Sequence, residues 1–577
     1  MCRVVAASLL AAVFLGSACP SSSPHKTSQS GASPTGAGDG GAPGLARPNA
    51  LDPTPRKSLP PAARLPQPSE VGAAPAGHAG GTLHVHLESE PSHLQPLNDP
   101  DASAITVTSG LIYQTLLTCA PDGYHPGLAE SWELAADGLS VLLHLRGAVR
   151  WHDRHAFGVL DVQATLEPLL RKMTAPTMPL LRAELSDIAT IELVAERTVR
   201  LNLRRPSDLV VRALCDVPIL PSHLVRPARE DIRADAVPIA RQPIGTGPYR
   251  FVSWERGKRI RLARFAESWG SPPAPQEIVF ELEPDAVRAL NRTRRGELDV
   301  LPRVLDVHYP EQVEPGTLRG LTTLYRLTPE RTSFLVVNHR RFPLGDARFR
   351  RALVMLWDRE RFAHELHRDL ARPVDGFLFG PPPPDGATAA AIPFDRKRAT
   401  ALLDGAGFRD SDEDGVRDHD RRPIRVTLLQ PLGAKSLALE ARAFVLEARK
   451  AGILIDLIPA DAPTILARLK RGDFDMAPLV WDGRADEDPS PLFGAGGAFN
   501  FGGYQSAAMN AHLDTLRIAA GPARRRPILV EIARLVAAEQ PVLFLYRHDV
   551  PALVSTRVHG LAAVGDRLDF LGVWLEK

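Results

Sequence analysis

The sequence predicts a mixed α/β fold, because the spacing of its apolar residues switches repeatedly between the period of a strand and that of a helix. Residues 140–146 alternate, with Val141, Leu143 and Leu145 on one face, as in a half-buried strand. Farther along, apolar residues recur at helical spacing between two apolar runs, 424–428 and 453–458. With 44% hydrophobic residues, the chain can bury the cores of about two or three domains.

The first eighteen residues have the organisation of a secretory signal. A short, weakly cationic start precedes a mostly apolar run, Val4 to Leu15, which is too short to span a bilayer because that needs about 20 residues. Small residues then lead to Cys19, as in the bacterial lipobox, although Leu15 lies one position farther back than the usual large apolar residue. We predict a signal peptide at 1–18 and lipidation of Cys19; the alternative is an ordinary secretory signal cut near Ala18.

The next segment, 19–81, is rich in Ser, Pro, Gly and Ala and has few large apolar residues. Such a composition buries too little surface to offset chain entropy, so we predict a disordered, lipid-anchored tether. No later segment is long and apolar enough to predict a transmembrane helix. The predicted location is therefore extracytoplasmic, in the periplasm or at the cell surface, with a lipid anchor in a membrane.

Within the mature chain the strand and helix signals follow in order. Residues 191–203 predict a hairpin that turns through residues 195–197. Gly245, Gly247 and Pro248 precede a strand and suggest a bend where the chain crosses between lobes, or else a plain surface turn. The runs at 424–428 and 453–458, with the helix between them and Gly452 as its stop, predict a βαβ unit, and a further helix is expected at about 463–471.

Charge and cysteine content narrow the function classes. A net charge of +2, from 69 Lys and Arg against 67 Asp and Glu, argues against nucleic-acid binding, which usually needs a strongly basic domain. The run Arg524–Arg526 therefore predicts a solvated helix face. Of the four cysteines, two lie in the signal segment, and Cys119 and Cys215 remain. They could form a disulfide or stay as two buried thiols, because the sequence carries no geometry.

Five motifs in one order resemble the signature of family 5 of the bacterial extracellular solute-binding proteins, the peptide, dipeptide and nickel receptors of ABC importers. They span the chain from about residue 80 to its end. The motifs are LAESWE with DGL, LHLR and WHD at 128–153, GTGPYR at 245–250, DARFRRAL with DR at 346–359, GDFD at 472–475, and Trp481 followed by Asp488 and Pro489.

The resemblance implies a two-lobed periplasmic-binding-protein-like fold of type II with an extra domain. The expected division is lobe I at 82–115, 200–330 and 540–577, a small inserted domain at 116–199, and lobe II at 331–539. The implied function is capture of a peptide-like or other small polar solute between lobes that close about hinge strands, then delivery to ABC permease subunits. We expect a monomer, no cofactor and no covalent chemistry.

The loop after Trp481 is the candidate ligand site. This aromatic follows an apolar strand, and ligands collect at the carboxyl ends of strands in open α/β sheets. Peptide-binding relatives carry an amine-binding aspartate three residues past this tryptophan, where this chain has Arg484. Without a gap Arg484 favours a carboxylate or phosphate; with an extra residue placed earlier, Asp486 takes the aspartate's role. Asp482 and Tyr113 complete the predicted ligand contacts.

Other groups of residues carry weaker predictions. Asp410, Asp412 and Asp414 have the spacing of a calcium loop, but Arg421 occupies the position of the closing Glu, so a surface turn is the simpler interpretation. The histidines at 84, 86 and 93 leave a metal or haem role open against simple exposure. No GxSxG, HExxH or P-loop motif occurs, and we predict no metal site and no enzyme. The rival functions are an exported hydrolase and a sensory lipoprotein not coupled to transport.

Overall fold

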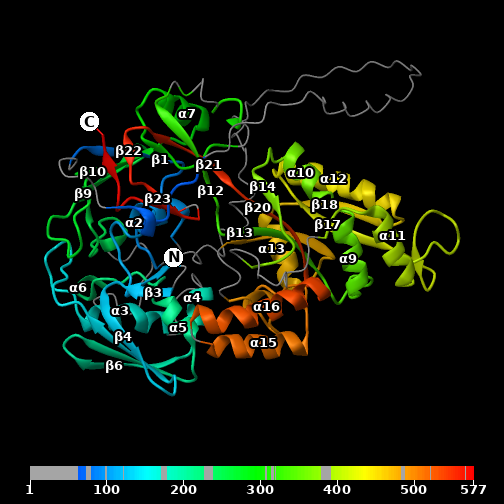
Figure 1. Cartoon of the computed structure of the whole chain (residues 1–577), viewed down its shortest axis with the longest axis horizontal. Helices are drawn as coiled ribbons and strands as arrows, with labels where there is room; N and C mark the ends of the chain where they lie inside the picture. The colour runs from blue at the N-terminus through cyan, green and yellow to red at the C-terminus, as the bar shows by residue number, and fades with distance from the viewer. Residues whose placement is uncertain are drawn as a thin grey trace, which may run out of the picture.

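The computed structural model has two lobes and a smaller domain (Figure 1). It describes residues 63–72, 80–97, 100–120, 123–170, 179–225, 238–305, 308–313, 318, 320–378, 392–482, 488–519, 521–565 and 567–576. The predicted signal peptide, Cys19 and most of the predicted tether lie outside these residues. Among the described residues, no helix combines the length and the apolar character that a membrane span requires.

Lobe I is built on a seven-stranded sheet of order β12-β21-β11-β1-β10-β9-β8. Its central strand β1 is parallel to β10, and β9 and β21 run antiparallel to their neighbours. Helix α2 (Ala102–Thr108) follows β1, and α7 (Ala286–Arg294) follows β10. The strands are β1 (Thr82–Leu87), β8 (Tyr249–Glu255), β9 (Arg259–Arg264), β10 (Glu277–Leu282), β11 (Val300–Leu301), β12 (Thr322–Leu327) and β21 (Val550–Ser555).

Short elements at both ends of the chain pack against lobe I. The C-terminal residues form two small antiparallel pairs, β22 with β25 and β23 with β24. Their bounds are Val558–His559 for β22, Ala562–Val564 for β23, Arg567–Asp569 for β24 and Trp574–Leu575 for β25, and the N-terminal 3-10 helix η1 spans Pro68–Glu70.

Lobe II is built on a six-stranded sheet of order β14-β20-β13-β19-β17-β18, with buried apolar clusters on both faces. Along β13, Phe334 and Val336 belong to one cluster and Leu335 and Val337 to the other, because successive strand residues point to opposite faces. The strands are β13 (Arg331–Val337), β14 (Ala371–Pro373), β17 (Arg425–Pro431), β18 (Leu454–Ala460), β19 (Met476–Asp482) and β20 (Val542–His548).

The helices of lobe II cover this sheet, and α15 and α16 extend toward the small domain (Figure 1). The predicted βαβ unit is confirmed, since α12 connects the parallel strands β17 and β18, and the helix expected at 463–471 is α13. The helices are α9 (Ala347–Met355), α10 (Arg359–Glu365), α11 (Arg396–Gly405), α12 (Lys435–Lys450), α13 (Ala462–Arg471), α14 (Ser490–Phe493), α15 (Ala507–Ile518) and α16 (Pro522–Glu539), with the short pair β15 (Asp418–His419) and β16 (Arg422–Pro423) at the edge.

The small domain is a four-stranded antiparallel sheet of order β4-β5-β7-β6. The predicted alternation at 140–146 is confirmed, because Val141, Leu143 and Leu145 are buried, and the predicted hairpin is β6 with β7. The elements are β4 (Ala129–Leu134), β5 (Ser140–Leu145), β6 (Ile188–Ala195), β7 (Thr198–Leu203), α3 (Val159–Leu170), α4 (Pro179–Leu185), α5 (Asp208–Ala213) and α6 (Ser222–Val225), preceded by the hairpin β2 (Leu117–Ala120) and β3 (Gly123–Pro126).

A disulfide joins Cys119 in β2 to Cys215 just after α5, with their Cα atoms 5.7 Å apart. The alternative of two free thiols is therefore wrong. The bond links the chain where it enters the small domain to the chain where it leaves, and backbone hydrogen bonds from Leu117 to Leu214 (3.3 Å) and from Ile219 to Gln114 (2.9 Å) join the same two connections.

The main sheets of the two lobes are joined by two short crossovers. Residues 328–330 connect β12 to β13, and Asp549 alone separates β20 from β21. The predicted boundary at 540 is therefore misplaced, since β20 belongs to the sheet of lobe II. The boundary at 199 also falls inside a strand, because β7 continues to Leu203.

The described residues include part of the predicted tether. Residues 63–72 pack on lobe I, where Ala63 pairs with Tyr325 and Leu65 is buried. Because β12 is the edge strand of its sheet, Ala63 covers backbone groups that would otherwise have no strand partner. The prediction of a disordered tether up to residue 81 is therefore wrong for this stretch.

The glycines of the GTGPYR motif allow a close approach of backbones. A Cβ atom on Gly245 would lie 1.8 Å from the carbonyl oxygen of Ile112, and one on Gly247 would lie 2.2 Å from that of Leu111. His152 of the small domain donates its backbone N–H to Gly245 at 2.9 Å. The motif therefore connects the small domain to β8 of lobe I, and the predicted crossing between the two lobes does not occur here.

Candidate functional site

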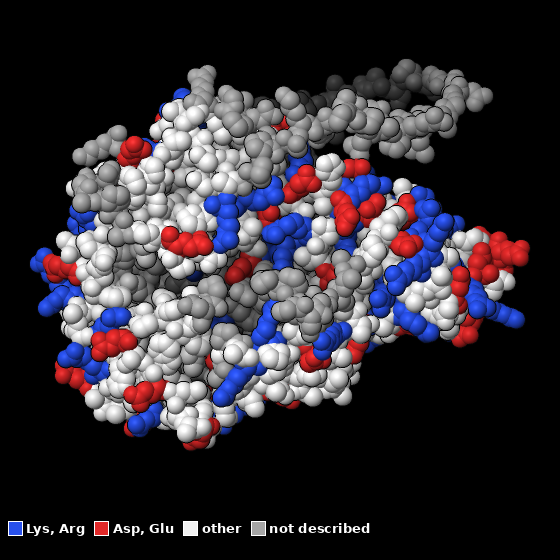
Figure 2. All heavy atoms as spheres, in the orientation of Figure 1, with Lys and Arg blue, Asp and Glu red and all other residues white. Residues whose placement is uncertain are grey.

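A cavity of about 1050 Å³ lies beside the crossover at 328–330 and is the candidate ligand site. Its wall includes residues of lobe I, of the small domain's connections, and of β14 and β20 in lobe II. This volume is slightly above the range of about 300–1000 Å³ that is usual for small-molecule sites. In the view of Figure 2, Lys and Arg side chains gather near the centre of the molecule, between the lobes.

Three arginines near the crossovers line this cavity: Arg326 at the end of β12, Arg372 in β14 and Arg547 in β20. Arg372 donates to Asp549 at 2.9 Å, and Arg326 lies 3.6 Å from the other oxygen of the same carboxylate. Burial raises the pKa of Asp549, although the two arginines act in the opposite direction. The carboxylate of the second crossover therefore pairs with one arginine from each lobe.

The neighbouring arginine, Arg547, is oriented by lobe II. It donates to the carbonyl oxygen of Leu378 at 2.6 Å and lies 3.5 Å from the hydroxyl of Thr332. Sequence reasoning missed these arginines and Asp549. Arg326, Arg547 and Asp549 lie close in sequence to the predicted lobe boundaries at 330 and 540, which was the available signal, whereas nothing in the sequence pointed to Arg372.

Aromatic side chains from lobe I form part of the cavity wall. Trp269 donates its indole N–H to Gln114 at 2.8 Å, and the guanidinium of Arg146 lies 4.5 Å from the centre of its ring. Tyr113, a predicted ligand contact, also lines the cavity. It is fully buried, its hydroxyl has no hydrogen-bond partner among the described residues, and burial raises its pKa. A polar ligand group could accept the hydrogen bond that this hydroxyl lacks.

The predicted loop site is only partly described. Trp481, at the end of β19, is buried, packs edge-on against Phe499 with ring centres 5.3 Å apart, and has no partner for its indole N–H among the described residues. Trp481 pairs with Thr332 of β13. Because β13 lies between β19 and β20 in the sheet, Trp481 is two strands away from Arg547 of β20. Arg484, Asp486 and the side chain of Asp482 lie outside the described residues.

A second set of contacts connects the small domain to lobe II, at the end of the molecule where α15 and α16 approach α4 and α5 (Figure 1). The buried carboxylate of Asp187 pairs with Arg517 of α15 at 3.3 Å and with Arg205 at 2.7 Å. The buried carboxylate of Asp208 in α5 lies 3.7 Å from Arg525 of α16. The pairs of Asp187 with Arg517 and of Asp208 with Arg525, which we call the latch, join the two parts of the molecule away from the crossovers.

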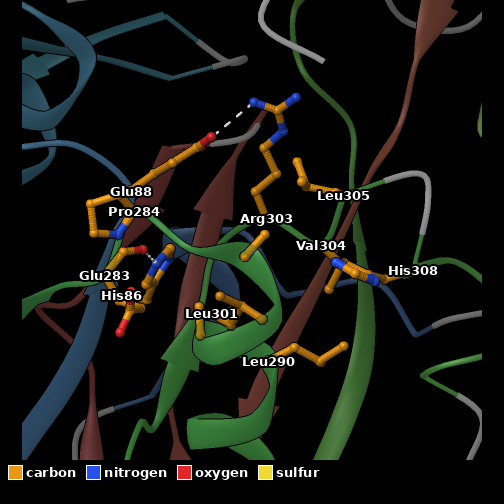
Figure 3. Close-up of a pocket in the computed structure, with 12 residues that line it drawn as sticks. His86, Glu88, Glu283, Pro284, Leu290, Leu301, Arg303, Val304, Leu305 and His308 are labelled. Atoms are coloured by element: carbon orange, nitrogen blue, oxygen red, sulfur yellow. Dashed lines mark hydrogen bonds and ion pairs between the residues drawn. The ribbon is translucent and has the colours of Figure 1, made fainter. Parts of the chain in front are cut away.

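The histidines considered for metal binding are not brought together. His84 pairs with Glu281 at 3.3 Å, and His86 hydrogen-bonds the carbonyl oxygen of Glu283 at 2.8 Å. Figure 3 shows His86 in the wall of a cavity of about 20 Å³, where Glu88 reaches Arg303. Such a volume suits about one water molecule, and burial lowers the pKa of His86. Neither these two residues nor His93 belongs to a group of potential metal ligands among the described residues.

The acidic loop at 410–418 forms a turn that its own carboxylates stabilise. Asp410 accepts from the backbone N–H of Gly415 at 2.9 Å, and Asp414 accepts from that of Val416 at 2.7 Å. Asp418 accepts from the backbone N–H of Ser411 at 2.9 Å. The contacts fit a surface turn, but Asp410, Asp412 and Asp414 also bring ligand oxygens within 4.8 Å of one another, so the surface turn and the calcium loop both stay predictions.

Two lobes, two short crossovers and a large cavity beside them form the architecture of a two-lobed binding protein. Residues 123–503 match the family model described as bacterial extracellular solute-binding proteins, family 5 Middle. The chain belongs to this family, so it is a substrate-binding receptor of an ABC importer that works outside the cytoplasm.

Relatives and solved structures agree with this assignment. Protein XP55 of Streptomyces lividans is 27% identical over 523 residues, covering 87% of this chain and 90% of that protein. Di/tripeptide-binding protein 2 of Pseudomonas aeruginosa is 26% identical over 432 residues, covering 70% of this chain and 76% of that protein. The structure of NikA from Brucella suis in complex with Fe(III)-EDTA has a TM-score of 0.73 at 21% identity, covering 86% of this chain and all of its own, and shows the fold.

Proposed function

We propose that the receptor captures a small polar or peptide-like solute in the cavity beside the crossovers, closes its lobes around it, and presents the closed form to the permease. The observation that carries this proposal is the cavity itself, whose wall combines β12 of lobe I with β14 and β20 of lobe II. A solute held by both lobes interacts more strongly with the closed form, and this difference is what favours closure. The site performs no covalent chemistry in this proposal.

The loop after Trp481 forms a second part of the site in this proposal. Trp481 stacks against the solute, and Asp482, Arg484 and Asp486 supply charge. With Arg484 in the amine-binding position, the solute presents a carboxylate or phosphate; with Asp486 there, it presents a cationic group. Tyr113 donates a hydrogen bond from the opposite wall, which its lack of a described partner supports.

Closure can be tested by small-angle scattering. A solute recovered from the purified protein by mass spectrometry should raise the melting temperature and reduce the radius of gyration, because it binds only the folded, closed form. Arg517→Ala removes a latch contact to Asp187 and should shift the solute-free protein toward a larger radius of gyration. Arg288→Ala, which removes contacts within lobe I only, serves as the matched control.

Two results would contradict this proposal. One is a radius of gyration that does not change at saturating solute, and the other is the absence of any solute that raises the melting temperature. Arg484→Ala and Asp486→Ala, measured by calorimetry, distinguish the two alignments of the loop. Loss of a buried charge partner should cost about 2–5 kcal/mol of binding free energy.

We propose further that Cys19 becomes the lipidated N-terminus and that the receptor works as a membrane-anchored monomer. Wild-type protein should fractionate with membranes, and Cys19→Ser should move to the soluble fraction because it loses its acyl chains, each buried methylene of which contributes about 0.8 kcal/mol. Immunoblotting of both fractions measures the distribution. Soluble wild-type protein would show that the anchor is absent.

A further inference from the structure

The described part of the cavity wall beside the crossovers carries more basic than acidic side chains. Among the described residues that line it are five arginines and two carboxylates, Glu330 and Asp569. The arginines are Arg64, Arg326, Arg372, Arg547 and Arg567. The whole chain, in contrast, has nearly balanced charge. A concave site with an excess of one sign of charge raises the local concentration of solutes of the other sign.

Two of these arginines oppose each other across a strand pair. Arg372 in β14 is directly opposite Arg547 in β20, so both side chains leave the same face of the sheet. Like charges in this position destabilise a sheet. In this protein the buried carboxylate of Asp549 contacts Arg372 and so offsets part of the positive charge of the arginine pair. An anion that enters the cavity at this face meets both guanidinium groups.

Arg372 is available to a solute, because 57% of its side chain is exposed while its Nη2 atom contacts Asp549. Arg326 is 30% exposed and reaches the same carboxylate from lobe I. Asp549 therefore holds two guanidinium groups, one from each lobe, at the cavity wall. An anion that contacted both would interact with the two lobes at once, which is what a solute needs in order to favour closure.

We propose that the solute carries a carboxylate or another oxyanion that binds the guanidinium groups of Arg372 and Arg326 at the crossovers, with its apolar part in the rest of the cavity, whose wall includes Trp269 and Phe570. This inference rests on the proposed function and names the chemical class of the solute. It uses residues of the described cavity and is independent of the loop that contains Arg484. A planar guanidinium matches the two oxygens of a carboxylate, so a neutral amide is a poor replacement.

The test uses matched pairs of probes that differ only in this group. Succinate and succinamide, benzoate and benzamide, the dipeptide Ala-Phe and its C-terminal amide, and inorganic phosphate are measured by calorimetry, together with any solute recovered from the protein. We expect each acid that binds to bind at least about 30-fold more tightly than its amide. Arg372→Gln and Arg326→Gln should each weaken the acid by a similar factor, and Arg372→Lys should weaken it less.

Arg348→Gln is the matched control, because Arg348 is exposed on α9 and pairs with Asp346 away from the cavity. Arg372 lies on the edge strand β14, so its replacement should leave the fold intact, which circular dichroism verifies. If a recovered solute binds but carries no anionic group, or if both glutamine variants bind it like wild type, the anion site is wrong and the receptor function stands. If no solute binds at all, the proposed function fails and this inference fails with it.

Discussion

Replacement of Glu440 by alanine should destabilise lobe II by about 3–5 kcal/mol, because this one buried carboxylate accepts hydrogen bonds from three side chains. His367 donates to it at 2.6 Å, Tyr546 at 2.7 Å and Trp357 at 3.2 Å. Glu440 is 1% exposed and lies on α12, whereas its partners come from β20 and from segments beside α9 and α10. The carboxylate therefore joins the sheet to the helices on one of its faces.

The environment of Glu440 explains the size of this effect. Burial raises the pKa of Tyr546, and the Glu440 carboxylate raises it further, so the phenol stays a donor. Burial, with His367 nearby, lowers the pKa of His548 to about 3. Water cannot reach these groups easily, so removal of the acceptor leaves buried donors without partners, at about 1–3 kcal/mol each.

Urea unfolding followed by tryptophan fluorescence measures the change in the free energy of unfolding. Glu440→Gln keeps the volume and one acceptor oxygen and should give an intermediate loss. Arg442→Ala lies on the same helix at an exposed position and should change stability by less than about 0.5 kcal/mol. If Glu440→Ala proves as stable as Arg442→Ala, the network contributes nothing and the argument from burial is wrong.

Some residues of the motifs that suggested the family are visible in sequence because they form local contacts, whereas the glycines of GTGPYR meet distant backbone at Leu111 and Ile112. Asp346 and Asp358 are the N-caps of α9 and α10, and Gly472 ends α13 with a φ of 69°. Arg350 donates to the carbonyl oxygen of Leu344, only a few residues away, and also to that of Gln540, 190 positions away, both at 2.8 Å. Signals of this kind depend on residues close in sequence, so the α/β fold and the βαβ unit could be predicted.

The arginine site could not be predicted in the same way. Arg326, Arg372 and Asp549 are separated by up to 223 positions, and they meet only because β14 pairs with β20 and β12 pairs with β21. Strand register between distant segments is not encoded in local spacing. The loop from 482 to 488, in contrast, was chosen through the resemblance, and it stays a prediction.

The structure of residues 63–72 was missed for a related reason. Residues 63–72 contain few large apolar side chains, and composition alone predicts disorder. Their order comes from partners in lobe I: Arg326 donates its backbone N–H to Ala63 at 2.9 Å, and Ala563 donates to Pro66 at 2.9 Å. An edge strand can order a polar segment whose own sequence gives little sign of structure.

Loss of the disulfide between Cys119 and Cys215 should destabilise the small domain by about 4 kcal/mol. The bond closes a loop of 96 positions that contains the whole four-stranded sheet. A cross-link between the two ends of an inserted domain restricts its unfolded chain, and the chain-entropy model gives about 4.7 kcal/mol for a loop of 100 residues. Strain in the native state reduces the measured value in many proteins, which is why we expect slightly less.

The measurement compares unfolding of wild-type protein with and without reductant, and of the double variant Cys119→Ala with Cys215→Ala. Reduced wild type and the double variant should both unfold at a lower denaturant concentration than oxidised wild type. Reductant should not change the unfolding midpoint of the double variant, and this result controls for effects of reductant on the rest of the chain. Because Cys119 and Cys215 also line the cavity, the same samples should bind solute more weakly once the connections at 114–119 and 214–219 are free to separate. Equal stability of oxidised and reduced wild type would mean that the backbone bonds between these connections already hold the domain in place.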